Sequence, residues 1–339
     1  MSSPGTGLNR NRYKPHQPQW NFDLHFRKDL QKLKITTTRV ATELDAKLVA
    51  AIANEHELSV DSKSSLFSEQ GALDFIAGYV DPSPAHLLGL NDESGFSAVV
   101  NLHPDSLKAR YFSDVYARPD VENLESIVRW TIELAERDHP DWNIWPGVNS
   151  LDTRLQSAWA SQGYEFLRRY YTMRMSITTA PNIRKIQDVD IRAIDLNNKE
   201  QVKLWHAVHQ ESFSKHFGFV PREFENWREL NLNESTIDPT GVFLAFQNEV
   251  AVGFCQCSND YAEEGKGFIN LLGVTEHNQG KGMGEALLQT GISYCLTKGF
   301  ETIELNVDTG NESGALKLYE KVGFVPESSW IQMHKPRGK

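Results

Sequence analysis

The sequence predicts a mixed α/β fold (an α+β mixed sheet) that the chain uses twice, once in each half. In both halves, short apolar runs rich in β-forming residues alternate with segments whose apolar residues recur at helical spacing, and these elements follow the same order. The chain has 339 residues, which is long enough for two domains. The halves also match near their ends, which indicates an internal repeat. The corresponding pairs are Trp159 and Tyr319, Gly163 and Gly323, Tyr164 and Phe324, and Met173 and Met333.

Four segments are expected along the chain. They are a basic N-terminal tail over 1–34, a first domain over 35–177, a linker over 178–188 and a second domain over 189–339. Pro181 indicates the linker, because proline disfavours regular structure. The tail is rich in Asn, Arg, Pro and Gln, which predicts a mobile start followed by one short helix over 22–33. For the residues after that start, the alternative to a mobile tail is an arm that docks on the acidic rest of the protein through Trp20, Phe22 and Phe26.

Each domain has its expected elements in order. In the first, Leu124, Ile127, Val128 and Ile132 recur at helical spacing and predict one helix of an α/β unit. The first domain is expected to contain strands over 35–42, 86–90, 95–102 and 108–117, and helices over 43–57 and 123–137. The second is expected to contain strands over 190–194, 242–246, 250–256, 267–275 and 302–308, helices over 199–213, 222–230, 281–298 and 312–322, and a last strand pair.

The composition argues against several kinds of partner. A formal net charge of −10 disfavours nucleic acid or an anionic membrane surface. The three cysteines lie in predicted core elements, and Cys255 and Cys257 have no second pair to complete a zinc site, so no metal is expected. The sequence starts without an apolar signal core, and no stretch is long enough to span a bilayer. We therefore expect a cytoplasmic protein, monomeric or homodimeric, in a reducing compartment.

The stretch from Gly267 to Leu288 has the strongest chemical signal. An apolar strand is followed by the glycine-rich turn over 279–284 and then by a helix. Glycines at a helix start let the backbone approach a ligand closely. The unpaired N–H groups and partial positive charge of a helix N-terminus favour phosphate or pyrophosphate, and Lys281 adds a full charge. A tight corner without a ligand is the alternative for the same glycines.

Three phosphate-binding motifs can be compared with this turn. It lacks the Lys-Ser/Thr that ends a Walker loop, and Leu287 stands where a dinucleotide fingerprint requires its third glycine. What remains is Gln-x-x-Gly-x-Gly, which resembles the coenzyme A pyrophosphate loop of the GNAT superfamily of N-acetyltransferases. Downstream, the segment over 311–324 is similar to the fourth helix of that superfamily, with its Leu-Tyr-Glu-Lys-x-Gly-Phe pattern. The resemblance covers residues 189–334 in order.

The resemblance implies two tandem GNAT (acyl-CoA N-acyltransferase) folds, as in the mycothiol synthases and their relatives, packed face to face. It also implies acetyl-CoA (coenzyme A) as co-substrate and a small-molecule amine as acceptor. The pantetheine arm would pair with strand backbone and the pyrophosphate with the turn. The implied coenzyme-binding residues are Leu272, Gly273, Val274, Gln279, Gly280, Lys281, Gly282, Met283, Gly284 and Asn311. The implied acceptor-binding residues are His209, His216, Phe268, Asn270 and Asp308.

Tyr319 is the implied catalytic acid, which would protonate the leaving thiolate. With a pKa of roughly 8.5 for a thiol and roughly 10 for tyrosine, this transfer is uphill by about 2 kcal/mol. A positioned donor tolerates that difference. Alternatively, Tyr319 is a core aromatic residue that packs on the helix face. Asn311 could instead be the N-cap of the helix that begins at Glu312.

Phe268 departs from the superfamily pattern, because it stands where the common glutamate base would be. Phenylalanine takes no proton, so the base lies elsewhere, acts through water, or is unnecessary for an amine of low pKa. The departure argues against the mycothiol precursor as acceptor. Candidate helpers are Glu211, His216, Asp308 and His209, each with a structural or solvated alternative.

The first domain is expected to lack the coenzyme. No glycine occurs between Gly95 and Gly147, and Asp120 and Glu122 in the loop before its helix would repel a pyrophosphate. Trp159 stands at the tyrosine position and has no acidic O–H. The sequence thus predicts an acetyl-CoA-dependent N-acetyltransferase that works by direct attack in a ternary complex, with the second domain catalytic. The alternatives are a non-catalytic acyl-CoA-binding module, mycothiol synthase proper and a protein-interaction scaffold.

Overall fold

The computed structural model describes residues 37–40, 43–64, 66–77, 86–92, 95–232 and 237–336. The basic tail, with its expected helix and the docking alternative through Trp20, Phe22 and Phe26, lies outside the described residues. Within them, no helix is both long and apolar enough to cross a membrane.

The two halves have the same order of elements. The first half contains β1 (Thr37–Val40), η1 (Glu43–Asp45), α2 (Ala46–Val60), α3 (Glu69–Ala77), β2 (His86–Asp92), β3 (Gly95–Asp105), η2 (Ser106–Lys108), β4 (Arg110–Ala117), α4 (Leu124–Asp138), β5 (Asn143–Asn149), α5 (Thr153–Ser161) and β6 (Glu165–Ser176). The second half contains β7 (Val189–Ala193), α6 (Lys199–Phe213), α7 (Phe224–Leu232), β8 (Ile237–Gln247), β9 (Val250–Ser258), η3 (Ala262–Glu264), β10 (Lys266–Val274), η4 (Glu276–Asn278), α8 (Met283–Thr297), β11 (Thr302–Asp308), α9 (Ala315–Val322) and β12 (Val325–His334). The mixed α/β fold and its repetition are confirmed, although sequence reasoning gave no range for α3, β5, α5 or β6.

The last helix of each half ends in the same way. Gly163 and Gly323 both adopt left-handed conformations, with φ of +83° and +112°. The next residue then donates its backbone N–H back into the helix, from Tyr164 to Trp159 at 3.2 Å and from Phe324 to Tyr319 at 3.0 Å. Such a turn favours glycine, because only glycine adopts this conformation without strain.

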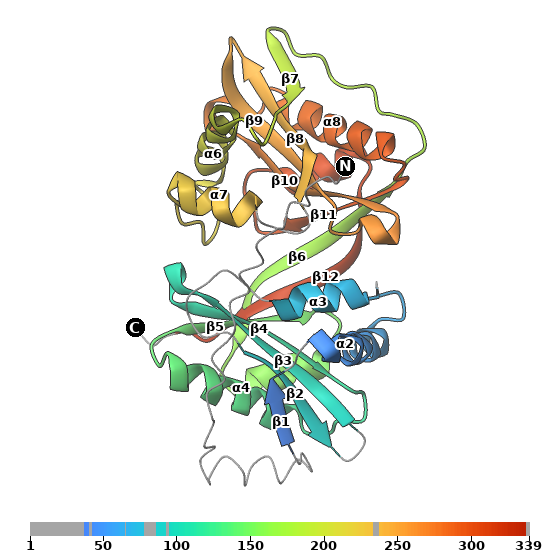
Figure 1. Ribbon diagram of the computed structural model, residues 1–339, viewed down its shortest axis with the longest axis vertical. Coiled ribbons are helices and arrows are strands. Elements are labelled where there is room, and N and C mark those ends of the chain that lie inside the picture. Colours follow the sequence, from blue (N-terminus) through green and yellow to red (C-terminus); the bar gives the residue numbers. More distant parts are fainter. Residues whose placement is uncertain are drawn as a thin grey trace, which may run out of the picture.

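The two halves exchange their last strands. The described strands form one 12-stranded sheet in the order β1-β2-β3-β4-β5-β12-β6-β11-β10-β9-β8-β7. The final strand of the chain, β12, pairs with β5 of the first half, and β6 pairs with β11 of the second half. The two exchanged strands pair with each other, antiparallel, at the centre of the sheet. Figure 1 shows β6 and β12 running between the upper and lower bodies.

This exchange corrects two expectations. The strand pair expected at the end of the second domain is a single strand, β12, and its partner β6 comes from the first half. The halves also join edge to edge through one sheet instead of packing face to face. The reason is backbone hydrogen bonding: the edges of β5 and β11 would otherwise present unpaired N–H and C=O groups, and each receives the last strand of the other half.

The cores show the same exchange. Met173 on β6 is buried in a cluster built from α8, α9 and the strands of the second half. Met333 on β12 is buried with Trp159 and Tyr164 in the core of the first half. Helices α2 and α3 cover the other face of the first half, and α6 and α7 the other face of the second. Each half therefore has a core on both faces of its part of the sheet, and one strand of each core belongs to the other half.

Candidate functional site

Strands β10 and β11 run parallel and then part. Their pairing runs from Lys266 opposite Thr302 to Ile269 opposite Leu305. The register of β10 with β9 shifts between Ile269 and Leu271, and β10 stays paired with β9 through Val274. The edge of β10 that faces β11 therefore opens at Asn270. An open strand edge offers backbone N–H and C=O groups to an extended ligand.

The glycine-rich turn connects the open end of β10 to α8. Gly280 and Gly282 both adopt left-handed conformations, with φ of +74° and +86°. Gly282 is the N-cap of α8 and no side chain caps the helix, which leaves its first N–H groups available. The side chain of Gln279 donates from Nε2 to the carbonyl of Val274 at 3.0 Å and fixes the turn against the strand. Such an arrangement of backbone N–H groups at a helix N-terminus is suited to an anion.

Gly273 and Gly284, the other two glycines among the implied coenzyme-binding residues, allow neighbouring elements to pack closely. A side chain at Gly273 would overlap Ser212 of α6 and the ring of Phe254, so α6 approaches the open part of β10 closely. A Cβ at Gly284 would lie 3.1 Å from Leu318 of α9. By contrast, a Cβ at Gly280 would meet nothing within 4 Å. The outer side of the turn is thus open, which fits a phosphate-bearing ligand.

Arg184, in the segment between the halves, is a site residue that sequence reasoning missed. Its guanidinium lies against Gly282, where any added side chain would overlap it. Its Nη1 donates to Oε2 of Glu285 at 3.0 Å, and its backbone N–H donates to Gln289 at 2.7 Å. The residue lies in a stretch without regular structure, so no periodicity pointed to it.

Three cations surround the start of α8. Lys321 of α9 shares the carboxylate of Glu285 with Arg184, at 2.8 Å, and Lys281 is exposed on the turn itself. The hydrogen bond from Lys321, followed by that from Arg184, lowers the pKa of Glu285, which therefore stays ionised. One carboxylate balances three cations, so this end of α8 has a local excess of positive charge.

Tyr319 lies on α9 inside the core of the second half. Its side chain is 7% exposed, and its ring meets Phe324 edge-on at 6.2 Å between centroids. Burial raises the pKa of Tyr319 above its usual value. The phenol is therefore neutral and available as a hydrogen-bond donor. A higher pKa also makes full proton transfer to a thiolate harder than the about 2 kcal/mol that ordinary values give.

Asn311 and Asp308 shape the turn between β11 and α9. The side chain of Asn311 accepts the N–H of Ser313 at 2.9 Å, and Asp308 accepts the N–H of Gly310 at 2.8 Å. The helix begins only at Ala315, with a glycine in the left-handed conformation as its N-cap. The N-cap alternative for Asn311 is therefore wrong, because the chain makes a further turn before the helix.

His216 and Asp308 come together at the open end of β11, and the first half completes their surroundings. The charge of Asp308 raises the pKa of His216, but burial has the larger effect and lowers it. Arg168 on β6 lies 3.5 Å from Asp308 and places its guanidinium 4.2 Å from the ring centroid of Phe217. Phe217 stacks in turn on Trp145 of β5, at 5.7 Å. Residues of both halves thus meet on this side.

His209 and Phe268 have mainly aromatic neighbours. His209 stacks on Phe213 at 4.9 Å and lies 5.6 Å from Trp227. Burial lowers the pKa of His209 to about 4, which makes it a weak base at neutral pH. Phe268 is 5% exposed and packs edge-on against Tyr261. These surroundings favour packing roles for both, and they leave Asn270, half-buried where the strand opens, as the better placed candidate.

The loop before α4 in the first half forms no comparable cradle. Arg154 donates to the carbonyls of Pro119 and Val121, at 3.1 and 2.6 Å, so the loop presents C=O groups on that side. Asn123 caps α4 by accepting the N–H of Ser126 at 3.3 Å. The start of α4 is thus capped by its own chain.

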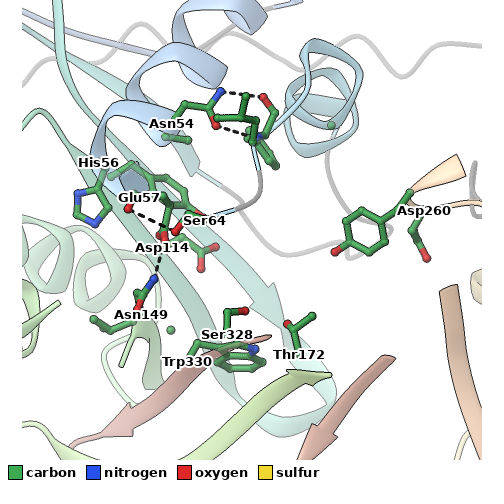
Figure 2. A pocket seen from close by; sticks show the side chains of 18 of the residues that line it. Asn54, His56, Glu57, Ser64, Asp114, Asn149, Thr172, Asp260, Ser328 and Trp330 are labelled. Carbon is green, nitrogen blue, oxygen red and sulfur yellow. Dashed lines mark hydrogen bonds between the residues drawn. The ribbon is translucent and has the colours of Figure 1, made fainter. Parts of the chain in front are cut away.

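A cavity of about 890 Å³ lies between the first half and a segment of the second half, away from the glycine-rich turn. Figure 2 shows it between α2, β4 and β5 of the first half and the segment around Asp260 of the second. Among the described residues, no group of three or more His, Cys, Asp or Glu side chains is arranged to hold a metal ion.

The sequence has relatives among characterised families. Residues 202–324 match the model of the Acetyltransferase (GNAT) family. The mycothiol acetyltransferase of Mycobacteroides abscessus is 30% identical over 185 residues, which cover 53% of this chain and 58% of that protein. The mycothiol acetyltransferase of Streptomyces scabiei is 30% identical over 168 residues, covering 48% and 52%. The matches span little more than half the length of these relatives.

Solved structures resemble nearly the whole chain. A GCN5-related N-acetyltransferase from Sphaerobacter thermophilus gives a TM-score of 0.75 at 19% identity, covering 88% of this chain and 95% of that one. A tandem GNAT protein from the clavulanic acid biosynthesis pathway gives a TM-score of 0.66 at 11% identity, covering 89% and 99%. At these identities the likeness concerns the fold, and it confirms that the chain has the tandem arrangement.

Proposed function

We propose that this chain, which contains a GNAT acetyltransferase domain within residues 202–324, transfers an acetyl group from acetyl-CoA to a primary amine of a small molecule. The single observation that supports it most is the uncapped, glycine-lined start of α8 directly beyond the open edge of β10. A pyrophosphate and an extended amide-containing arm need these two features side by side. Both lie in the part of the chain that matches the family.

The residues of the second half would bind and orient the coenzyme. Acetyl-CoA supplies the activated acyl group. The N–H groups over 280–284 would hold the pyrophosphate, with Lys281 and Arg184 contributing charge. The backbone over 272–274 would pair with the pantetheine arm. Gln279 holds the turn and the strand end together, so the two binding elements keep a fixed spacing.

Tyr319 would act on the leaving group. Its neutral phenol is suited to donate a hydrogen bond to the thiolate sulfur as the acyl–sulfur bond breaks. Because burial raises its pKa, stabilisation of the thiolate by this bond requires less free energy than complete proton transfer. Fixed donors aimed at developing charge are a general source of rate enhancement.

The acceptor amine must reach the site without its proton. Phe268 offers no base, and burial lowers the pKa of both His209 and His216. An α-amine with a pKa of about 7.8 is roughly one-third neutral at about pH 7.5, whereas a lysine-like amine is about 0.1% neutral. We therefore propose an acceptor of low pKa that attacks directly in a ternary complex.

The test is a panel of amines of different pKa, incubated with acetyl-CoA and assayed by release of free thiol. Acetyl transfer to at least one amine is expected, with a pH midpoint that follows the pKa of the amine. A midpoint that stays fixed across amines would reveal an enzyme base. If acetyl-CoA binds but no thiol is released with any amine, the non-catalytic acyl-CoA-binding alternative replaces the enzyme.

A further inference from the structure

The cavity beside β4 and β5 of the first half occupies the position that the proposed acetyl-transfer cleft occupies beside β10 and β11 of the second half. Parallel strands β4 and β5 pair from Arg110 opposite Asn143 to Ser113 opposite Pro146 and then part, as β10 and β11 do. The cavity opens beyond this point and has a volume of about 890 Å³, within the usual range for small-molecule sites. Strand β12, which pairs with β5, continues its wall with Ser328 and Trp330, and the segment over 259–264 of the second half closes it from the other side.

Two carboxylates stand close together on the first-half wall. Glu57 of α2 accepts a hydrogen bond from Asn149 at 2.8 Å, and Asp114 of β4 accepts one from Asn101 at 3.1 Å. Neither has an ion-pair partner among the described residues. Burial, and then the nearby charge of Glu57, raises the pKa of Asp114. The two groups repel each other, and a cation between them would relieve that repulsion.

Two more carboxylates face them from the second half. Asp260 accepts a hydrogen bond from Ser258, and Glu263 is exposed. Neither forms an ion pair within the described part of the chain. Figure 2 shows Asp260 across the cavity from Glu57 and Asp114. Negative charge therefore lies at both ends of the cavity.

The basic side chains that line the cavity do not neutralise these four groups. Arg174 is engaged with Glu304, at 2.7 Å, and with Glu327. Lys63 is exposed. His56 pairs with Asp152 at 3.0 Å. The lining thus has an excess of negative charge that no described side chain balances.

A buried hydroxyl at the point where the strands part also lacks a partner. Ser113 lines the cavity, is 1% exposed, and its Oγ makes no hydrogen bond. Buried polar groups are normally satisfied, so an unpaired hydroxyl beside a cavity indicates a missing partner. Apolar contact is available as well, because Tyr116 and Trp330 line the same space. Aromatic rings of this kind attract ammonium groups and pack against methylene chains.

We propose that this cavity binds a linear diamine or polyamine, with one ammonium group between Glu57 and Asp114 and a second near Asp260 and Glu263. Acyl-CoA does not fit here, since the loop before α4 presents carbonyls and the acidic residues Asp120 and Glu122. The first half thus retained a ligand cavity without the phosphate cradle, and its ligand is cationic.

The experiment is calorimetric titration of the full chain with putrescine and spermidine at low salt and neutral pH. We expect one site per chain, weakened at least tenfold in Asp114→Asn and separately in Glu57→Gln. These substitutions keep size and hydrogen bonding while removing charge. Asp120→Asn, an acidic residue outside the cavity lining, is the matched control and should bind as the wild type does. Thermal unfolding checks that each variant is folded.

The outcomes separate this site from the proposed acetyl-transfer site. Diamine binding should persist in Gly282→Asp, because that substitution lies in the glycine-rich turn and away from the cavity. The proposal is overturned if the wild type binds neither amine. It is equally overturned if Asp114→Asn and Glu57→Gln, both folded, bind with wild-type affinity, since the heat would then come from another site. Failure of coenzyme binding alone would affect only the acetyltransferase proposal.

Discussion

The guanidinium of Arg184 occupies the space that any side chain at Gly282 would need. Arg184 belongs to the segment that joins the two halves, and Gly282 starts the helix whose N–H groups form the proposed anion cradle. The connection between the halves is therefore part of the proposed coenzyme site. Gly282 satisfies two requirements at once: a left-handed backbone and room for a cation.

Gly282→Asp should weaken coenzyme A binding at least tenfold while the protein stays folded. The new carboxylate would repel the pyrophosphate and displace or neutralise Arg184. Gly299→Asp is the matched control, because Gly299 also has a positive φ (+88° against +86°) but lies at the other end of α8. Calorimetry should give one coenzyme A per wild-type chain. Two equivalent sites, or an unchanged affinity in Gly282→Asp, would contradict the site.

Arg184→Ala should lower coenzyme A affinity by roughly three- to tenfold, the scale expected for a half-exposed charged contact. Arg184→Lys should restore part of the loss. Arg192→Ala is a suitable control, since Arg192 is equally exposed and also makes ion pairs, but on the edge strand β7. Titration with coenzyme A and with its 3′-dephospho form locates the contact. A loss only with coenzyme A indicates the 3′-phosphate, and a loss with both indicates the pyrophosphate.

Tyr319→Phe should reduce kcat by roughly 100-fold or more and leave coenzyme A affinity and packing unchanged, because only the hydroxyl is lost. Tyr164→Phe is the matched control, with a tyrosine that is buried to the same degree in the first half (5% exposed against 7%). Steady-state kinetics with the best amine of the panel measures both variants. An unchanged kcat in Tyr319→Phe would leave Tyr319 with a packing role.

Acid should destabilise the protein through His209. Its folded-state pKa is about 4, below the unfolded value of about 6.5. The unfolded chain therefore binds a proton first as pH falls, and stability that is present above about pH 6.5 is lost on the way to pH 4. Between about pH 8 and 5 this loss is about 2 kcal/mol. Urea unfolding across this range should show a smaller loss for His209→Phe, whereas replacement of the exposed His277 should leave the profile as in the wild type.

Cutting the chain at the linker should yield two fragments that fold only together. A fragment over 182–339 would lack β6, and the edge of β11 would be left open from Thr302 to Asp308. A fragment ending at residue 181 would lack β12 beside β5. Co-expression should give a stoichiometric, soluble complex, because each fragment supplies the strand that the other needs. A soluble, active 182–339 fragment on its own would show that the exchanged strands are dispensable.

Much of the fold followed from local sequence. The bounds of α6 and β11 match the expected ranges, because apolar spacing and flanking turn residues fix such elements locally. The repeat could be seen in the sequence because Gly163 and Gly323 both adopt the left-handed conformation that ends the last helix of each half. The glycine-rich turn over 279–284 could likewise be predicted from the sequence. A positive φ, or the close approach of another group to the backbone, favours glycine wherever it occurs.

Other features depend on residues far apart in the sequence. The sequence predicted a strand pair at the end of the second domain, but not that β6 would be one of its members. Either half could have completed its own sheet, and only the assembled fold shows that β6 and β12 are exchanged. The contacts of Arg184 with Gly282 and of Phe217 with Trp145 depend in the same way on the assembled fold. So does the position of Asp260 across the cavity from Glu57 and Asp114. The sequence by itself determined most of the elements and the glycine-rich turn, because backbone conformation is a short-range property. Only the tertiary structure shows which strand, which cation and which cavity wall of one half come from the other half. These contacts join residues far apart in the sequence, so they depend on packing in three dimensions.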